Sequence, residues 1–362
     1  MFVLDSHCDT PSQIIRGRDL AADNPMAHVD FPKLKRGGVD GAFFALYISA
    51  ELTGDAAFEY YERLLRGVHE TLNVNSEHAV LTTSEQQALI NKELGLFSVF
   101  LGLENGSPIG KSLDRLTDFH NHGIRYVTLC HSADNEICDS CASTVKTWNG
   151  LSPFGREVVR EMNRLGMLID VSHISDDSFY DVLKYSSRPV VATHSCCRTL
   201  ADHPRNMTDD MIRALAAEGG VVQINFYPVF LDAGFGKLLS GSEVMKRGED
   251  VEAAFISDPF NDEYRSEWFK VLRELQELAR PSYKVIVDHI DHVVDLVGID
   301  HVGLGSDFDG IAVTPEGLED ISMIPVLFDE MRHRGYSDAD MEKIASKNFF
   351  RVFSASGAVQ SL

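Results

Sequence analysis

Short apolar runs alternate with amphipathic stretches along most of this chain, and this alternation is the feature that most limits the folds open to it. Each run has the length of a β-strand and is apolar at consecutive positions, which is typical of parallel strands covered on both faces. Eight strands are predicted, at residues 2–4, 42–48, 95–103, 123–130, 167–172, 189–193, 221–226 and 300–306. Helices with one apolar face are predicted between them, at residues 57–72, 154–165, 176–185, 208–219 and 285–296.

Eight strands that alternate with helices favour a closed (β/α)8 TIM-type barrel over an open, doubly wound sheet. No Gly-x-Gly-x-x-Gly sequence follows the first strand, so a dinucleotide site has no support. A length of 362 residues is compatible with two domains, but α/β barrels also reach this size as one unit. We therefore expect a single barrel domain over residues 1–362, with an insertion at about 227–281 on the loop face and C-terminal helices at about 323–353. Within the insertion, the acidic stretch at 263–278 is predicted to be helical.

The charge balance and the amino-terminal sequence limit the partners and the location of the protein. Lys and Arg total 33 against 55 Asp and Glu, a formal charge of -22, which repels nucleic acid. Asp5 follows Met1 so closely that no signal peptide fits, and no run approaches the roughly 20 apolar residues of a membrane span. We expect a cytoplasmic protein without membrane attachment. The pair Cys138 and Cys141 is interpreted as two loop thiols without a function, because no second Cys-x-x-Cys completes a zinc site.

Residues that can bind a metal or transfer a proton follow six of the eight predicted strands. These residues are His7 with Asp9, Glu104, His131, His173, His194 and Asp307. The strands of a barrel are parallel, so their carboxyl ends meet at one mouth, where barrel enzymes hold their active sites. His7 and Asp9 lie two residues apart and point to one face of an extended strand, whereas Cys8 points to the other face and is expected to pack in the core.

The number of ligand candidates indicates more than one metal ion. Three imidazoles and two or three carboxylates exceed the three protein ligands that a catalytic zinc needs. Two ions roughly 3.5 to 4 Å apart would use them all. Glu104 rises between the two ligand clusters in barrel order, so it is the carboxylate best placed to bridge two ions.

Seven short motifs resemble the successive motifs of the renal (membrane) dipeptidase family, which belongs to the amidohydrolase superfamily of metal-dependent barrels. The resemblance covers most of the chain, and the long insertion is more similar to bacterial members than to animal ones. The motifs are His7-Cys8-Asp9, Leu103-Glu104-Asn105-Gly106, Leu129-Cys130-His131, Asp170-Val171-Ser172-His173, Thr193-His194-Ser195, Pro204-Arg205-Asn206 and Gly305-Ser306-Asp307-Phe308-Asp309-Gly310.

The resemblance implies two zinc ions per chain, bridged by Glu104. One ion would be held by His7, Asp9 and Glu104, and the other by Glu104, His173 and His194. The activity implied is hydrolysis of free dipeptides, including L,D-dipeptides, through a hydroxide that bridges the metals. A homodimer is expected from the resemblance only.

Three further residues receive roles from the same resemblance. His131 would face the substrate and polarise the scissile carbonyl, and Asp307 would be the proton shuttle. Arg205 would hold the terminal carboxylate of the dipeptide, a task that suits a planar fork of donors.

Two alternative readings differ in what they predict. Another binuclear amidohydrolase would act on N-acyl amino acids, cyclic amides or phosphotriesters, and Arg205 argues against neutral substrates because they offer no carboxylate. A barrel that has become a binding or scaffold protein would contain well under one equivalent of metal, which the full set of ligand residues argues against.

Overall fold

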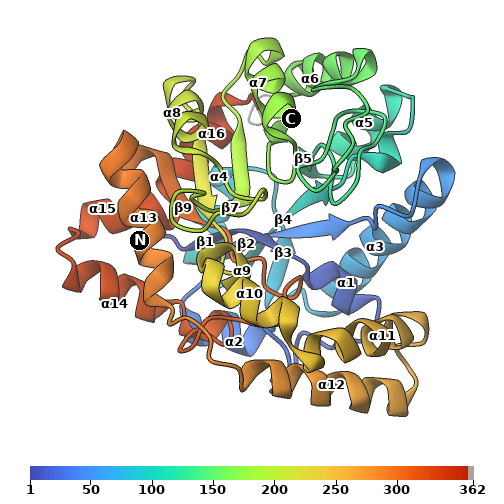
Figure 1. The fold of residues 1–362 in the computed structure, drawn as a ribbon, viewed down its shortest axis with the longest axis vertical. Coiled ribbons are helices and arrows are strands. Elements are labelled where there is room, and N and C mark those ends of the chain that lie inside the picture. The colour runs from blue at the N-terminus through green and yellow to red at the C-terminus, as the bar shows by residue number, and fades with distance from the viewer. Residues whose placement is uncertain (358–362) are drawn as a thin grey trace.

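The strands form a ring of parallel neighbours surrounded by helices in the computed structural model, which describes residues 1–357 (Figure 1). The order around the ring is β1-β2-β4-β5-β6-β7-β8-β9, and a parallel bridge between Cys8 and Phe308 brings the last segment beside the first. The bounds are β1 Leu4–Cys8, β2 Gly41–Tyr47, β4 Phe97–Glu104, β5 Ile124–Thr128, β6 Leu168–Asp170, β7 Val191–Ser195, β8 Val221–Ile224 and β9 Val302–Leu304. The predicted (β/α)8 barrel is confirmed.

The five predicted helices are present, and each covers the outside of the ring (Figure 1). Side chains of Ser152, Ser175 and Thr208 accept hydrogen bonds from the first-turn backbone of three of these helices, which places their starts. Gly166, at φ 75°, ends one of them in the left-handed conformation that glycine tolerates. The bounds are α3 Gly54–Val74, α6 Pro153–Leu165, α7 Asp176–Tyr185, α8 Asp209–Ala217 and α13 Lys284–Val297.

Several short elements escaped the sequence prediction. β3, Ala79–Leu81, pairs with β4 alone and stands off the barrel path. Its three residues are too few to show an alternation of apolar and polar positions, so periodicity could not find it. Four helices of five to nine residues were also missed: α1 Thr10–Ile14, α2 Phe31–Gly37, α4 Glu85–Glu93 and α5 Asp114–Asn121. In α4, for example, only Ala88 is buried, so the helix shows no apolar face.

The interior of the barrel is filled at the amino ends of the strands. The rings of Phe43 and Phe100 lie 4.8 Å apart, and Phe43 lies 5.1 Å from Phe349 of α16 (Asn348–Ala355). The Asn348 side chain donates hydrogen bonds to the carbonyl groups of Ile299 and Val302, which fixes α16 against this end. Since aromatic packing closes the lower end, a ligand can enter only at the carboxyl ends of the strands.

The expected insertion is almost entirely helical, whereas only its acidic part at 263–278 was predicted to be a helix. Four helices follow one another: α9 Pro228–Leu231, α10 Ala233–Gly241, α11 Glu243–Ser257 and α12 Asp262–Gln276. They share a small core of their own that includes Phe235, Phe255 and Trp268. In Figure 1 α9 and α10 lie near the middle of the view, and α11 and α12 run along the bottom of the molecule.

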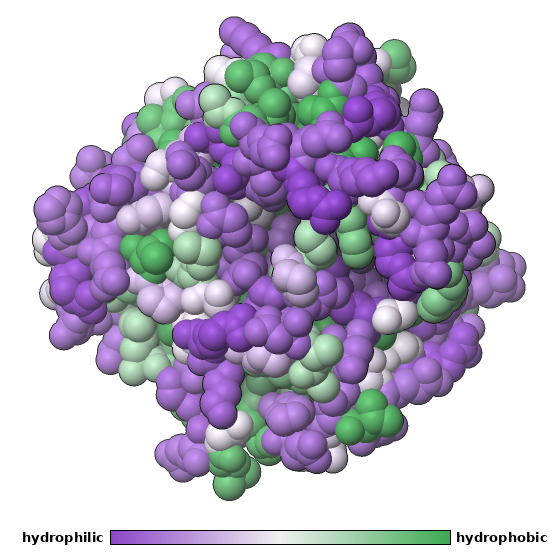
Figure 2. Space-filling view, turned by 90° about the horizontal axis from the view of Figure 1, so that it is seen from below, coloured by the Kyte–Doolittle hydropathy of each residue, from purple (hydrophilic) through white to green (hydrophobic). Residues whose placement is uncertain are grey.

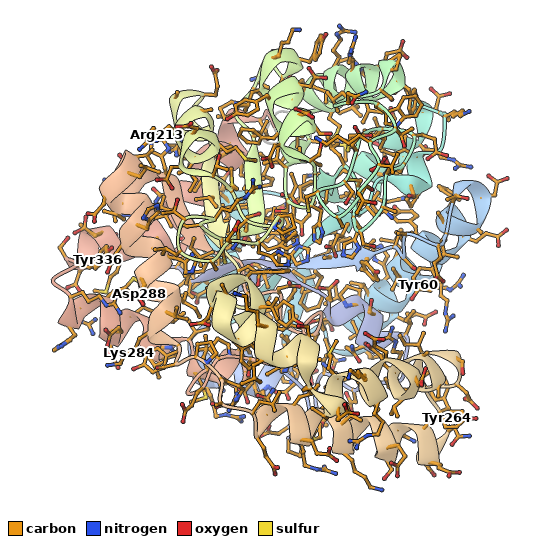
Figure 3. The ribbon with its side chains drawn as sticks, in the orientation of Figure 1. Tyr60, Arg213, Tyr264, Lys284, Asp288 and Tyr336 are labelled. Atoms are coloured by element: carbon orange, nitrogen blue, oxygen red, sulfur yellow. The ribbon has the colours of Figure 1, made fainter. Side chains whose placement is uncertain are left out.

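The chain closes with helices, as expected for 323–353. Besides α16 these are α14 Pro325–His333 and α15 Asp338–Glu342. Lys284, Asp288 and Tyr336, labelled in Figure 3, belong to the polar seam between α13 and the end of α14. The Arg334 guanidinium donates to Asp288 there at 2.6 Å. The last five residues of the predicted domain, 358–362, lie outside the described residues. Within residues 1–357, no helix is long and apolar enough to cross a membrane.

Candidate metal centre

Glu104, the last residue of β4, lies at the centre of the predicted ligands and turns its two carboxylate oxygens to different partners. Oε2 lies 3.4 Å from Nε2 of His7. Oε1 lies 3.2 Å from Nε2 of His173 and 3.4 Å from Nε2 of His194. One oxygen of this carboxylate therefore faces His7 and the other faces His173 and His194, which is an arrangement expected of a bridging ligand.

The other predicted residues complete the cluster on both sides of Glu104. Nε2 of His7 lies 3.5 Å from Oδ2 of Asp9, and Nε2 of His131 lies 3.7 Å from Oε1 of Glu104. Three overlapping groups have ligand atoms within 4.8 Å of one another: His7, Glu104 and His194; Glu104, His131 and His173; and His7, Asp9 and Asp307. All the residues predicted from the strand ends thus meet at one place.

The donor atoms have the spacing that a metal requires, and two of them have lone pairs without a hydrogen-bond partner among the described residues. Two ligands bound to one tetrahedral zinc at about 2.0–2.1 Å lie about 3.3 Å apart, and the separations around Glu104 and His7 run from 3.2 to 3.5 Å. Nε2 of His7 and Oδ1 of Asp9 are buried and have no hydrogen-bond partner among residues 1–357. A divalent cation fits this donor set, because it would satisfy both atoms.

The negative charges of Asp9 and Glu104 also favour the binding of a cation in the cluster. Burial and the negative charge of Glu104 raise the pKa of the Asp9 carboxyl to about 6. Burial opposes protonation of His7, but Glu104 and Asp9 outweigh it and hold the pKa of this imidazole well above its usual value. Buried carboxylates that crowd together in this way are stabilised by a bound positive charge.

A tyrosine orients His7. Nδ1 of His7 lies 2.9 Å from the hydroxyl of Tyr126 on β5. The tautomer that donates Nδ1–H to this hydroxyl leaves the lone pair of Nε2 facing Glu104 and Asp9. Gly102 on the neighbouring strand makes room for the tyrosine, since a Cβ atom there would lie 2.1 Å from its ring.

A threonine and an aspartate orient His194 in the same way. The Thr193 hydroxyl lies 2.8 Å from Nδ1 of His194 and donates at 2.7 Å to Oδ2 of the buried Asp170. The hydroxyl can therefore only accept from the ring, so Nδ1 carries the proton and Nε2 is free for a metal. Asp170 also accepts from the hydroxyl of Thr128 and the backbone of Ser172.

Asp307 follows β9 in a half-buried, constrained position. Its φ of 65° lies in the left-handed region, and the Asn225 side chain donates to its Oδ2 at 2.8 Å. Burial, followed by the charge of Asp9, raises the pKa of the Asp307 carboxyl to about 7. Gly310 lies against both carboxylates, since a Cβ atom there would be 2.2 Å from Asp9 and 2.7 Å from Asp307.

His131 is the most accessible histidine of the cluster. Its side chain is 22% exposed, against 12% for His173 and about 1% or less for His7 and His194. Burial, with the nearby charges of Arg205 and His7, lowers its pKa to about 3, so the ring is neutral at physiological pH. A neutral imidazole that is open to the mouth can donate one hydrogen bond to a ligand.

Arg205 lies 6% exposed beside the cluster. Its Nη1 donates to the Ser195 hydroxyl at 2.9 Å and its Nη2 to the His194 carbonyl at 2.6 Å. The guanidinium lies 5.6 Å from the centre of the Phe230 ring. Nε is buried without a partner among the described residues, so the side chain is anchored while keeping unused donors.

Backbone strain concentrates at the same mouth. Five residues other than glycine have a left-handed φ between residues 1 and 357, and four of them follow barrel strands. Such conformations cost about 1–3 kcal/mol each and gather at functional sites. These four are Asn105 after β4, His173 after β6, and Asp307 and Asp309 after β9.

Cys8 behaves as predicted. It is fully buried in the main hydrophobic core, with its sulfur 3.5 Å from the carbonyl oxygen of Phe43. The supporting residues Tyr126, Thr193, Asp170 and Asn225 were not predicted to act at the site. Tyr126 lies in an apolar run and was read as core, although a buried phenol needs a hydrogen-bond partner and could have been questioned.

A barrel of parallel strands with histidines and carboxylates at its mouth defines the class of metal-dependent barrel hydrolases. Residues 1–361 match the membrane dipeptidase family, peptidase family M19, and the chain belongs to that family. It is thus a metallo-dipeptidase, a hydrolase that uses metal ions. The predicted family resemblance is confirmed.

Individual relatives agree with this assignment. The dipeptidase aclJ of Aspergillus oryzae is 31% identical over 349 residues, which cover 94% of this chain and 73% of that protein. The crystal structure of the probable dipeptidase PvdM from Pseudomonas aeruginosa superposes with a TM-score of 0.83 at 27% identity, over 98% of this chain and 95% of that one.

A second solved structure shares the fold at lower identity. A metallo peptidase from Rhodobacter sphaeroides, solved with a phosphinate mimic of the dipeptide L-Ala-D-Ala, has a TM-score of 0.80 at 24% identity. The alignment covers 98% of this chain and 99% of that chain.

Proposed function

We propose that the protein is a zinc-dependent dipeptidase that binds two metal ions per chain. His7, Asp9 and Glu104 would hold one ion, and Glu104, His173 and His194 the other. The observation that carries the proposal is the division of the Glu104 oxygens, with Oε2 3.4 Å from His7 and Oε1 3.2 Å from His173. Imidazole and carboxylate ligands at these separations suit zinc.

The reaction proposed is hydrolysis of the peptide bond by water. When bound, such a metal pair supplies a Lewis acid for the carbonyl oxygen and lowers the pKa of a shared water. Asp307 accepts the proton of the attacking water and returns it to the leaving amine, a task suited to a carboxyl that lies beside Asp9 and is held in place by the Asn225 side chain. His131, neutral and accessible, donates a hydrogen bond to the developing oxyanion.

Arg205 selects substrates that carry a free carboxylate. Its guanidinium is buried beside the cluster and anchored through Ser195 and the His194 carbonyl. An anchored guanidinium loses little conformational entropy when a carboxylate binds its remaining donors. This supports free dipeptides as substrates, with the carboxy-terminal group at Arg205.

The test is an assay of zinc-loaded protein with matched L,L- and L,D-dipeptides, together with their N-acetylated and C-amidated forms. We expect about two equivalents of metal per chain and hydrolysis of the free dipeptides, and little hydrolysis of the amides, which lack the carboxylate. A metal content near one equivalent would contradict the bridging role of Glu104. Faster hydrolysis of N-acyl amino acids than of dipeptides would favour the related amidohydrolase activity instead.

Several expectations from the sequence stay predictions. Cytoplasmic location and a homodimer are to be tested by fractionation and by light scattering of the purified protein. Tolerance of a D-residue is decided by the L,D arm of the assay above, with the phosphinate mimic of L-Ala-D-Ala as a binding probe. The single-domain organisation predicts one cooperative unfolding transition for the metal-free chain.

A further inference from the structure

The cavity at the barrel mouth extends far beyond the metal ligands. It has a volume of about 680 Å³ and is lined by Glu104 and His131 at its base and by residues of α11 and α12 at its far side. Cavities of roughly 300–1,000 Å³ hold ligands of drug size. A dipeptide of two small residues would leave much of this space empty.

The part of the cavity beneath the insertion, here called the chamber, has mainly apolar walls. Its wall residues come from α11, α12 and the loop between α1 and α2: Met26, Phe255, Ile256, Trp268, Phe269 and Leu272. From below, where α11 and α12 lie, the surface is mostly hydrophilic and its apolar residues form small separate groups (Figure 2). The apolar residues of these helices thus include a set that faces the cavity.

Two of the charged side chains at the chamber form ion pairs within the protein. Arg18 pairs with Asp309 at 2.5 Å, and Arg265 pairs with Asp262. Arg16 lies over the Phe255 ring at 5.9 Å from its centre. Arg18 and Arg265 therefore have carboxylate partners, whereas Glu252 of α11 has no ion-pair partner among residues 1–357. Apart from Glu252 and Arg16, the surface left for a ligand at the far side is chiefly hydrocarbon and aromatic.

The position of the chamber indicates which part of a dipeptide would reach it. Arg205 stands in the loop after β7, whereas the chamber lies over the loops after β9 and β1, which are two and three strands further around the barrel. With the carboxylate at Arg205 and the scissile carbonyl at Glu104, the amino-terminal residue extends away from Arg205. Its side chain is then directed toward α11 and α12.

We propose that the chamber receives the side chain of the amino-terminal residue, and that the enzyme prefers dipeptides in which this side chain is large and apolar. The inference rests on the proposed dipeptidase function. Burial of apolar surface in a preformed pocket supplies the selectivity, and each added methylene that fits is worth roughly fourfold in kcat/KM.

The first experiment compares two series of dipeptides with the zinc-loaded protein. We expect kcat/KM for L-Trp-L-Ala to exceed that for Gly-L-Ala at least about tenfold, and the reversed pair L-Ala-L-Trp and L-Ala-Gly to show a much smaller ratio. Equal ratios in the two series, or a larger ratio in the reversed pair, would overturn the assignment. Hydrolysis of no dipeptide at all would overturn the dipeptidase function together with it, so the two failures are distinguishable.

Variants of α11 and α12 locate the selectivity. Phe269→Ala and Ile256→Ala each shorten a side chain that lines the chamber. Because Ile256 is 48% exposed, its replacement leaves the fold intact. Tyr264→Ala is the matched control, because Tyr264 lies on α12 outside the cavity lining and is seen at the periphery in Figure 3. We expect the ratio for L-Trp-L-Ala over Gly-L-Ala to fall several-fold in the first two variants and to stay unchanged in the control.

A binding measurement gives a readout that does not depend on turnover. Phosphinate mimics of L-Phe-D-Ala and L-Ala-D-Ala are titrated calorimetrically into the zinc-loaded protein. We expect the first to bind at least about tenfold more tightly, with a more negative heat-capacity change, because more apolar surface is buried. Equal affinities and equal heat-capacity changes would refute the chamber as a side-chain site.

Discussion

Replacing Tyr126 by phenylalanine tests whether the metal centre depends on residues behind its ligands. The substitution removes the hydroxyl that lies 2.9 Å from Nδ1 of His7 but keeps the ring. Packing is preserved, because the ring still contacts Phe43 at 5.1 Å and fills the space left by Gly102. Any effect therefore comes from the lost hydrogen bond.

The magnitude follows from the burial of His7. Its ring is fully buried, and the Tyr126 hydroxyl is the only partner of Nδ1 among residues 1–357. A buried donor left without a partner costs about 1–3 kcal/mol. Without the hydroxyl, no hydrogen bond fixes the tautomer and the ring orientation of His7. Loss of a hydrogen bond that orients a metal ligand weakens metal binding by about 10–100-fold. We expect this loss at the ion held by His7.

The assay is a competition titration of metal-free protein against a chromophoric chelator, with thermal unfolding measured in parallel. Tyr61→Phe is the matched control. Tyr61 lies in α3, away from the metal centre, and is also fully buried. Its hydroxyl lies 3.0 Å from Nδ1 of His122. Tyr126→Phe should lose about 1–3 kcal/mol of stability, whereas Tyr61→Phe should lose about 0.5–1.5 kcal/mol, because its partner His122 is exposed to water. Unchanged metal affinity in Tyr126→Phe would refute the orienting role.

Three other substitutions separate binding from chemistry. Asp307→Asn should keep the metal content by atomic absorption and lower kcat by at least about 100-fold, and turnover like that of the wild type would remove the proton role. Arg205→Met should raise KM for dipeptides at least about tenfold, and an unchanged KM would exclude the carboxylate contact. Gly310→Ala places a methyl group 2.2 Å from Oδ2 of Asp9, so metal content should fall, and full metal occupancy with normal activity would show that the loop can shift.

The sequence was sufficient to predict the barrel and the gathering of the candidate ligands at one mouth, because both depend on local signals. A strand covered on two faces must be apolar at consecutive positions, and a polar ligand can follow only where the strand leaves the core. His131, His173 and Asp307 were found in this way, each just after a predicted strand. Arg205 gave no such signal, since it stands in a loop, and only the family resemblance identified it.

The helical insertion shows where these local signals fail. Its helices α9 and α10 are short, and α11 has polar residues around much of its circumference, so only the stretch that became α12 was predicted. What stabilises them is a small shared core in which Phe255 meets Trp268 and Phe235. Those contacts join residues from separate helices and are invisible to a periodicity measured along one segment.

The sequence by itself determined which side chains reach the mouth of the barrel, because strand length and polarity fix the residue at each strand end. Tertiary structure alone decided how they are used there. The register between β4 and its neighbours directs one Glu104 oxygen to His7 and the other to His173. Barrel closure sets the hydroxyl of Tyr126 behind His7, and the insertion extends the mouth into an apolar chamber. These relations are distances between residues far apart in the chain, and only packing of the whole barrel sets them.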